Sequence, residues 1–266
     1  MVKVDVLNLE GSKVKSVDLP EQFNEDYEPD LVNRAALVVV SHNRQPYGTN
    51  PQAGQTYSAK LSRRRRNYKT SYGKGISRVS RKVMWRRGTQ FHWVGAAVPG
   101  TVGGRKANPP KATKIWSLNI NTNERKKAIR SALAGVLKSK LVIVEDKFEI
   151  LKLAKEAKKV LSSLGFSVES IKRTKPGRAR SRGRGVRYKK HALVVVSKNC
   201  NVVKALANLA GYDSVDVKSL NANILSLGYA MPRECIFTEG ALNILSKEKL
   251  YIGGKKWELN KLLNIL

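Results

Sequence analysis

Arginine side chains and aromatic rings are interleaved through residues 61–93, a stretch that contains no aspartate or glutamate. Near its start it has four consecutive arginines, Arg63 to Arg66, and it continues with basic residues every few positions among Tyr, Trp and Phe. A guanidinium group is a planar fork that binds phosphate oxygens in pairs, and an aromatic face accepts an unstacked nucleobase. An anionic lipid surface would instead favour lysines along an amphipathic helix. The residue types therefore indicate RNA as the partner.

The positive charge of the whole chain is segregated. The formal net charge is +31, and residues 31–123 hold 18 Lys and Arg but no acidic residue. Residues 170–212 hold 12 more, again without an acid, and ten of these lie between Lys172 and Lys190. A basic run alone can be a solvated face or a localisation signal. The length of the two acid-free segments, with an almost neutral remainder, favours a polyanionic partner.

The candidate RNA-binding side chains are the long basic ones of these two segments. In the first segment they are Arg44, Arg63, Arg64, Arg65, Arg66, Lys69, Lys74, Arg78, Arg81, Lys82, Arg86, Arg87, Arg105 and Lys106. In the second segment they are Arg173, Arg178, Arg180, Arg182, Arg184 and Arg187.

No pattern of catalytic, cofactor-binding or metal-binding residues is complete. The glycine-basic clusters around Lys74 and at residues 103–106 lack the spacing of a Walker A loop or a dinucleotide fingerprint. The turn at Glu145 and Asp146 has no glycine to admit a pyrophosphate. The two cysteines and three histidines lack metal-ligand spacing. We therefore expect no catalytic residues, no cofactor and no metal. The alternative is an RNA-modifying enzyme that grips its substrate with the basic loops.

The nearly neutral part of the chain alternates between strand and helix patterns. The runs LVIV from Leu141 and LVVV from Leu193 are continuously apolar, which is typical of parallel strands covered on both faces. We therefore predict an α/β fold, a three-layer globular domain with a mostly parallel central sheet. The expected strands are residues 1–9 and 13–19 as a hairpin, 140–146, 166–171, 192–197 and 214–220. The expected helices are residues 30–43, 123–139 with Asn123 as N-cap, 151–164, 202–210, and a last helix capped by Thr238.

Two basic loops interrupt this alternation. We expect a globular domain from residues 1–43 and 115–266, with a basic loop at 172–191 inserted between two strands. Residues 44–114 are expected to be an extended RNA-binding loop, because a connection of that length without apolar periodicity is either functional or disordered. Its glycines and unpaired charge cannot offset the entropy of ordering, so we expect it to order only against a partner. The apolar runs are too short for a membrane span.

Several motifs, in order along the chain, resemble one protein family. They are NRQPYGTNPQAG from Asn43, SYGKG from Ser71, ANPPKA from Ala107, RSALAG from Arg130, LVIVED from Leu141, LNANIL from Leu220 and IFTEGAL from Ile236. The chain resembles the family of universal large-subunit ribosomal protein number four in its long archaeal and eukaryotic form. The absence of a long lysine-rich C-terminal extension favours the archaeal form, and residues 251–266 match no motif of the family.

The resemblance implies a structural constituent of the large ribosomal subunit, with its globular domain on the outer surface. It implies that the 44–114 loop threads into the large ribosomal RNA and lines part of the peptide exit tunnel. The implied partners are that RNA, neighbouring large-subunit proteins and the nascent polypeptide, in the cytoplasm and without a membrane. We expect the loop tip at residues 72–84, with Tyr72, Gly73, Lys74, Gly75, Arg78 and Met84 as candidate tunnel-facing residues. A free RNA-binding regulator is a further alternative.

Overall fold

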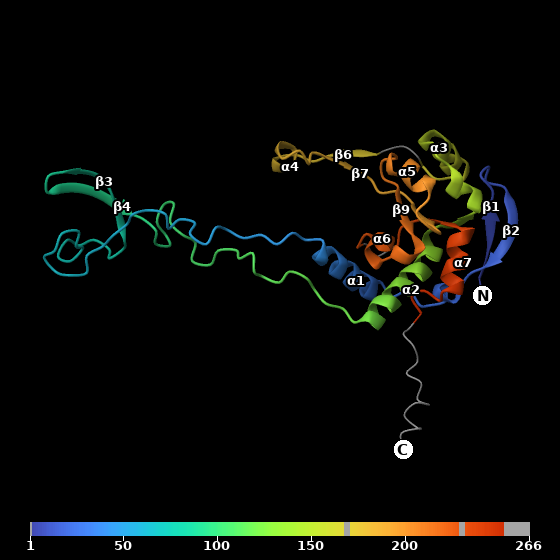
Figure 1. Cartoon of the computed structure of the whole chain (residues 1–266), viewed down its shortest axis with the longest axis horizontal. Coiled ribbons are helices and arrows are strands. Elements are labelled where there is room, and N and C mark those ends of the chain that lie inside the picture. The colour runs from blue at the N-terminus through green and yellow to red at the C-terminus, as the bar shows by residue number, and fades with distance from the viewer. Residues whose placement is uncertain (1, 168–170, 229–231, 253–266) are drawn as a thin grey trace, which may run out of the picture. The chain divides into compact units, whose positions relative to one another are not determined.

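A six-stranded sheet forms the centre of the larger of two units in the computed structural model (Figure 1). That unit comprises Met1–Asn43 and Ser117–Leu266, and the second unit is Arg44–Trp116. The structure describes residues 2–167, 171–228 and 232–252.

The strands of the sheet follow the order β2-β1-β5-β10-β8-β9. β1 pairs antiparallel with β2, as the predicted N-terminal hairpin requires, and all other neighbours in the sheet pair in parallel. The strand bounds are β1 (Lys3–Leu7), β2 (Lys13–Asp18), β5 (Leu141–Val144), β8 (Leu193–Val196), β9 (Asp213–Asp216) and β10 (Cys235–Thr238). The prediction of a mostly parallel central sheet is confirmed.

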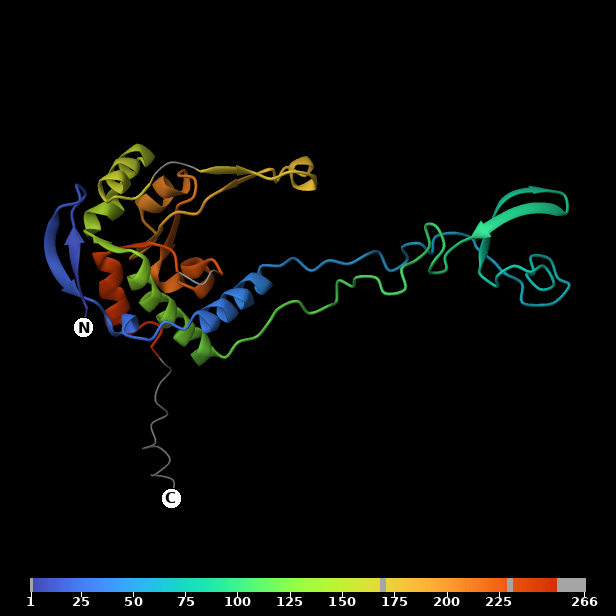
Figure 2. The ribbon, with the colours of Figure 1, turned by 180° about the vertical axis from the view of Figure 1, so that it is seen from behind.

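Alternate side chains of the parallel strands enter two separate hydrophobic clusters. Leu193 and Val195 of β8 join a cluster with helices α1, α2, α6 and α7, whereas Val194 and Val196 join one with α3 and α5. The helices are α1 (Pro29–His42), α2 (Thr122–Ser139), α3 (Ala154–Ser163), α5 (Asn201–Ala207), α6 (Ala222–Ser226) and α7 (Glu239–Lys247). Helices therefore cover both faces of the sheet (Figure 2), and the predicted three-layer arrangement is confirmed.

Short 3-10 helices shape the connections of this unit. They are η1 (Glu21–Phe23), η2 (Asp146–Ile150) and η3 (Val217–Ser219). Because η3 begins directly after β9, the strand predicted at 214–220 is too long at its C-terminal end.

Two helix starts test the predicted N-caps. Thr238 caps α7, since its hydroxyl oxygen accepts a hydrogen bond from the backbone N of Ala241 at 3.3 Å. For α2 the cap is Asn121, whose side-chain oxygen accepts from the backbone N of Asn123 at 3.2 Å. The prediction of Asn123 as N-cap is therefore wrong, because the extended backbone that a cap needs lies two residues earlier.

Two strands differ from the sequence-based expectation. β10 lies between β5 and β8 in the sheet but was not predicted, because four residues are too few to establish a period. The strand predicted at residues 166–171 is wrong at Phe166, Ser167 and Ile171, which belong to no strand. The other three residues of that prediction, 168–170, lie outside the described residues.

The second unit contains an antiparallel hairpin that the sequence analysis did not predict. Its strands are β3 (Arg81–Arg87) and β4 (Gln90–Gly95), joined through Gly88 and Thr89. Gly88 has φ +58° at the first central position of the turn, where a two-residue hairpin turn of type II′ favours glycine. The chain segments before and after the hairpin run side by side, and the backbone N of Thr49 donates to the carbonyl of Pro110 at 3.0 Å.

The basic loop at 172–191 is a two-stranded ribbon. β6 (Lys172–Thr174) and β7 (Val186–Tyr188) pair antiparallel, and the short helix α4 (Arg178–Ser181) lies between them (Figure 1).

Candidate nucleic-acid interface

One face of the β3–β4 hairpin is covered by aromatic packing within the second unit. The Phe91 ring meets Tyr68 and Trp93 edge-on, with ring centroids 5.2 Å and 5.1 Å away. The Arg86 guanidinium lies 5.3 Å from the centroid of Tyr68, and that of Arg81 lies 5.1 Å from the centroid of Trp93. Aromatic quadrupoles attract cations at these distances, so the rings fix the two arginines in place.

Other cations of the second unit also rest on rings. The Lys82 ammonium lies 3.9 Å from the centroid of Tyr57, and the Arg44 guanidinium lies 3.9 Å from that of Trp116. Trp116 in turn stacks on Tyr47, with centroids 5.2 Å apart. The residue types alone indicate base stacking for these aromatic side chains, but in the structure many of the rings lie against a basic neighbour.

The candidate phosphate-binding residues of the second unit are mostly solvent-exposed. Arg63 to Arg66 lie in an exposed turn, and Lys69, Arg81 and Lys82 are the partly buried ones. Within the described residues, no Arg or Lys of Arg44–Trp116 forms an ion pair with a carboxylate. These charges are therefore available to an external anion.

The six candidate tip residues occupy two different elements. Residues 72–75 form a turn in which Gly73 and Gly75 have positive φ, +73° and +64°. The Arg78 guanidinium lies 4.6 Å from the centroid of the Tyr72 ring, so those two candidates are in contact. Met84 instead lies in β3 at a register shift between Val83 and Trp85, with its side chain 57% exposed. The structure brings the first five together in one segment and places Met84 in the hairpin.

The chain segment after the β3–β4 hairpin, which contains Arg105 and Lys106, lies against the segment before the hairpin, which contains Gly48 and Gly54. A Cβ atom at Gly54, where φ is +76°, would collide with the backbone N of Arg105. The same holds at Gly48 against the backbone of Ala112. Glycine is needed at both positions because the two segments approach each other closely. The side chains of Arg105 and Lys106, two of the candidate RNA-binding residues, are exposed, while the backbone at Arg105 packs against the other segment.

The β6–β7 ribbon concentrates cations in a small area. Arg173 and Arg187 are direct cross-strand partners, an arrangement of like charges that is unfavourable without a counterion. The two arginines line a groove of about 600 Å³ together with Lys175 and Lys189, which the sequence analysis did not single out. The exposed residues Arg178, Arg180, Arg182 and Arg184 lie in and after α4, at the end of the ribbon.

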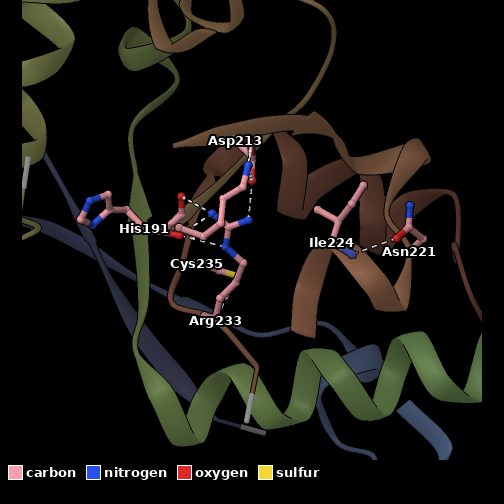
Figure 3. A network of polar contacts seen from close by, with 8 residues as sticks. His191, Asp213, Asn221, Ile224, Arg233 and Cys235 are labelled. Atoms are coloured by element: carbon pink, nitrogen blue, oxygen red, sulfur yellow. Dashed lines mark hydrogen bonds and ion pairs between the residues drawn. The ribbon is translucent and has the colours of Figure 1, made fainter. Parts of the chain in front are cut away.

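A buried arginine fastens the base of this ribbon to the sheet (Figure 3). The Arg233 side chain, 7% exposed, donates to an oxygen of Asp213 at 2.7 Å and to the backbone carbonyls of His191 and Ala192. Lys190 pairs with the same carboxylate at 2.7 Å. Burial opposes ionisation of Asp213, but the hydrogen bonds from Lys190 and Arg233 outweigh it and lower the pKa of that carboxyl. The ribbon is thereby anchored where its second strand meets β8.

The carboxyl ends of the parallel strands, where α/β enzymes commonly bind ligands, are filled by the protein's own side chains. The Glu149 carboxylate accepts from the backbone N of Ser197 at 2.7 Å, from its hydroxyl at 2.6 Å and from the Thr238 hydroxyl at 2.6 Å. Asp146 accepts from the backbone N of Gly240 at 2.6 Å, at the start of α7. These carboxylates occupy the donors that an anionic substrate would use.

The cysteines carry no sign of reactivity. Burial raises the pKa of the Cys235 thiol to about 12 and also raises the pKa of Cys200, and the thiolate is the nucleophilic form. Within the described residues, no three His, Cys, Asp or Glu side chains form a group suited to a metal ion. No helix in the described part of the chain has the length and apolar character needed to cross a membrane.

The sequence of residues 17–248 matches the family described as Ribosomal protein L4/L1 family. This chain belongs to that family. Its relatives include an archaeal protein from Nanoarchaeum equitans named large ribosomal subunit protein uL4, which is 41% identical over 94% of this chain and 100% of the relative. Proteins of the same name from Archaeoglobus fulgidus and Methanocaldococcus jannaschii are each 36% identical over 92% of this chain and 99% of their own length.

The comparisons confirm the family resemblance and its archaeal character. The match includes both basic regions, the second unit and the ribbon, because it extends over residues 17–248. Proteins of this ribosomal family are structural components rather than enzymes, which agrees with the filled carboxyl ends of the strands.

Proposed function

We propose that this protein is a structural, RNA-binding constituent of the large ribosomal subunit. One observation carries the proposal. Among the described residues, the exposed Arg and Lys side chains of Arg44–Trp116 and of the β6–β7 ribbon have no carboxylate partner, apart from Lys190. Family membership supplies the setting, which is the large subunit with its RNA and proteins.

Within this function the two basic regions have different tasks. Residues 44–114 enter the large-subunit RNA as an extension, and residues 72–84 reach the peptide exit tunnel, where they meet the nascent polypeptide. The ribbon binds phosphates beside the globular domain, which docks on RNA and on neighbouring proteins. Support for this assignment comes from the exposed guanidinium groups and from the glycine turn at Gly73 and Gly75.

An RNA-modifying enzyme is disfavoured by the geometry of the sheet. Glu149 and Asp146 satisfy the hydrogen-bond donors at the carboxyl ends of β8 and β10 and at the start of α7. A substrate phosphate would have to displace a carboxylate from each position.

Sedimentation of ribosomal subunits through a high-salt wash tests the proposal. Tagged protein expressed in an archaeal host should remain with large subunits, because many simultaneous phosphate contacts and a docked domain oppose release. Protein that sediments with neither subunits nor RNA would contradict it. Protein that binds free RNA but not subunits would assign it to the regulator alternative.

A further inference from the structure

The second face of the β3–β4 hairpin remains open to solvent and carries a pair of aromatic rings. Trp85 and His92 are direct cross-strand partners, their rings are nearly parallel at 11°, and the ring centroids are 6.4 Å apart. The Trp85 side chain is 54% exposed, and His92 is exposed as well. The pair is thus two stacked aromatic rings that remain exposed on this face of the hairpin.

The two faces of this hairpin differ although they belong to the same strands. On the covered face, Phe91 and Trp93 pack with Tyr68. On the open face, the side chains of β4 are Gln90, His92 and Val94, all exposed. The rings of the covered face pack within the unit, whereas Trp85 and His92 on the other face contact each other and remain exposed.

Cations flank the open rings along the hairpin. On the same face, Arg87 pairs with Gln90 on one side of the rings, and Lys82 pairs with Val94 on the other side. Arg87 is exposed, whereas Lys82 is partly buried, with its ammonium on the Tyr57 ring. The Met84 side chain, at the register shift next to Trp85, is also 57% exposed. Residues 31–123 contain no acid, so no carboxylate of this segment offsets the positive charges near the rings. A ligand of this surface should combine a flat apolar face with negative charges on both sides.

We propose that the Trp85–His92 pair is a stacking platform for an unpaired nucleobase of RNA, with Arg87 and Lys82 contacting the phosphates on either side. Aromatic side chains on a strand surface stack unpaired bases in several RNA-binding modules. This inference rests on the proposed RNA-binding function and adds a specific site and ligand to it. It places this base contact on the hairpin, outside the turn at residues 72–75.

A nucleobase suits this surface better than a peptide. A peptide segment would need acidic side chains to match the flanking cations, whereas every nucleotide carries a phosphate next to its flat base. The rings and Val94 beside them are exposed rather than enclosed. Stacking needs only a flat, accessible ring.

Binding of the full-length protein to two single-stranded probes tests the platform. One probe is an oligoadenylate of ten nucleotides, and the other is an abasic ribose-phosphate strand of the same length. The double variant Trp85→Ala with His92→Ala should reduce the preference for oligoadenylate over the abasic strand by roughly fivefold to a hundredfold. The dependence of affinity on salt should stay unchanged, because the cations that bind the phosphates are all kept.

Two further variants control the result. Trp85→Phe keeps a ring and should retain most of the base preference, whereas Trp85→Lys should lose the preference while raising affinity for both probes. A base preference that is unchanged in the double variant would overturn the platform while leaving salt-dependent RNA binding intact. Failure of the unaltered protein to bind either probe at low salt would instead overturn the proposed function.

In assembled subunits, a photoreactive benzophenone side chain in place of Trp85 should form crosslinks to RNA. Crosslinks to the nascent polypeptide instead would overturn the assignment to a nucleobase and place the face in the tunnel.

Discussion

In the first unit, Leu193 and Val195 are fully buried between the sheet and its helices, whereas in the second unit Phe91 and Trp93 are only half-covered by another ring and by arginines. Among the described residues, Ala96 is the one fully buried apolar side chain of Arg44–Trp116. Burial of apolar area supplies most of the favourable free energy of folding. The comparison indicates that the first unit is stable by its own packing. The second unit buries little apolar surface and exposes positive charge, which suits the RNA-binding role proposed for it.

The largest effect is expected from a charge in the central sheet. Val195→Asp places a carboxylate between two helix layers, at a position with no exposed surface. An unpaired buried charge should cost about 4 kcal/mol or more, which approaches the total stability of a domain. Soluble expression and a thermal unfolding transition should both be lost. A variant that unfolds cooperatively near the original temperature would show that the sheet does not carry the stability.

The second-largest effect on stability is expected at Asp213, which pairs with Arg233 and Lys190 at the base of the ribbon. Asp213→Asn leaves the buried Arg233 guanidinium without its carboxylate and should cost about 2–4 kcal/mol in the free energy of unfolding. Chemical denaturation measures this, and Lys218→Ala, which breaks an exposed pair with Glu248, is the matched control with an expected cost below about 1 kcal/mol. Equal costs for the two variants would contradict the role of the anchor.

The same anchor predicts a dependence of stability on pH. The folded-state pKa of Asp213 lies below its ordinary value of 3.8. Its contribution is therefore fully present above pH 3.8 and is lost as pH falls through the folded-state pKa. Between neutral pH and about pH 3, the unaltered protein should lose more stability than Asp213→Asn does. Parallel curves for the two proteins would contradict the assignment.

A smaller effect, on binding rather than folding, is expected at the end of the ribbon. Replacing Arg178, Arg180, Arg182 and Arg184 by Ala should weaken binding to ribosomal RNA and lower the log–log salt slope by roughly 0.7 to 0.9 for each phosphate that is no longer neutralised. The exposed side chains make no ion pair among the described residues, so unfolding should be unaffected. An unchanged slope would mean that this part of the ribbon is only solvated.

Only a small effect on the stability of the first unit is expected from deletion of residues 72–84. Although the deletion removes part of β3, the buried clusters of the first unit contain no residue of that range. The main thermal transition should therefore shift by no more than a few degrees, while the tunnel constriction widens in subunits that contain the truncated protein. Unfolding of the first unit, or unchanged footprints of tunnel-binding drugs, would break the proposed division between the two units.

Several features could be predicted from the sequence because they depend on local patterns. Continuous β-branched runs at Leu141 and Leu193 predicted buried parallel strands, and the acid-free segments predicted where unpaired positive charge lies. The cap at Thr238 followed from residue type and position. The family motifs extended these patterns to a ribosomal function, and the match over residues 17–248 confirms the family.

Other features depend on which residues meet in space, and the sequence alone did not determine them. The place of β10 in the centre of the sheet, the anchoring of the ribbon by Arg233, and the filling of the strand ends by Glu149 all join segments far apart in the chain. The two unlike faces of the β3–β4 hairpin arise in the same way, because pairing register decides which rings are covered by Tyr68 and which stay open. The helix or strand propensity of a short segment does not depend on such pairings. Their free energy comes from tertiary packing and from hydrogen bonds between residues that are distant in the sequence.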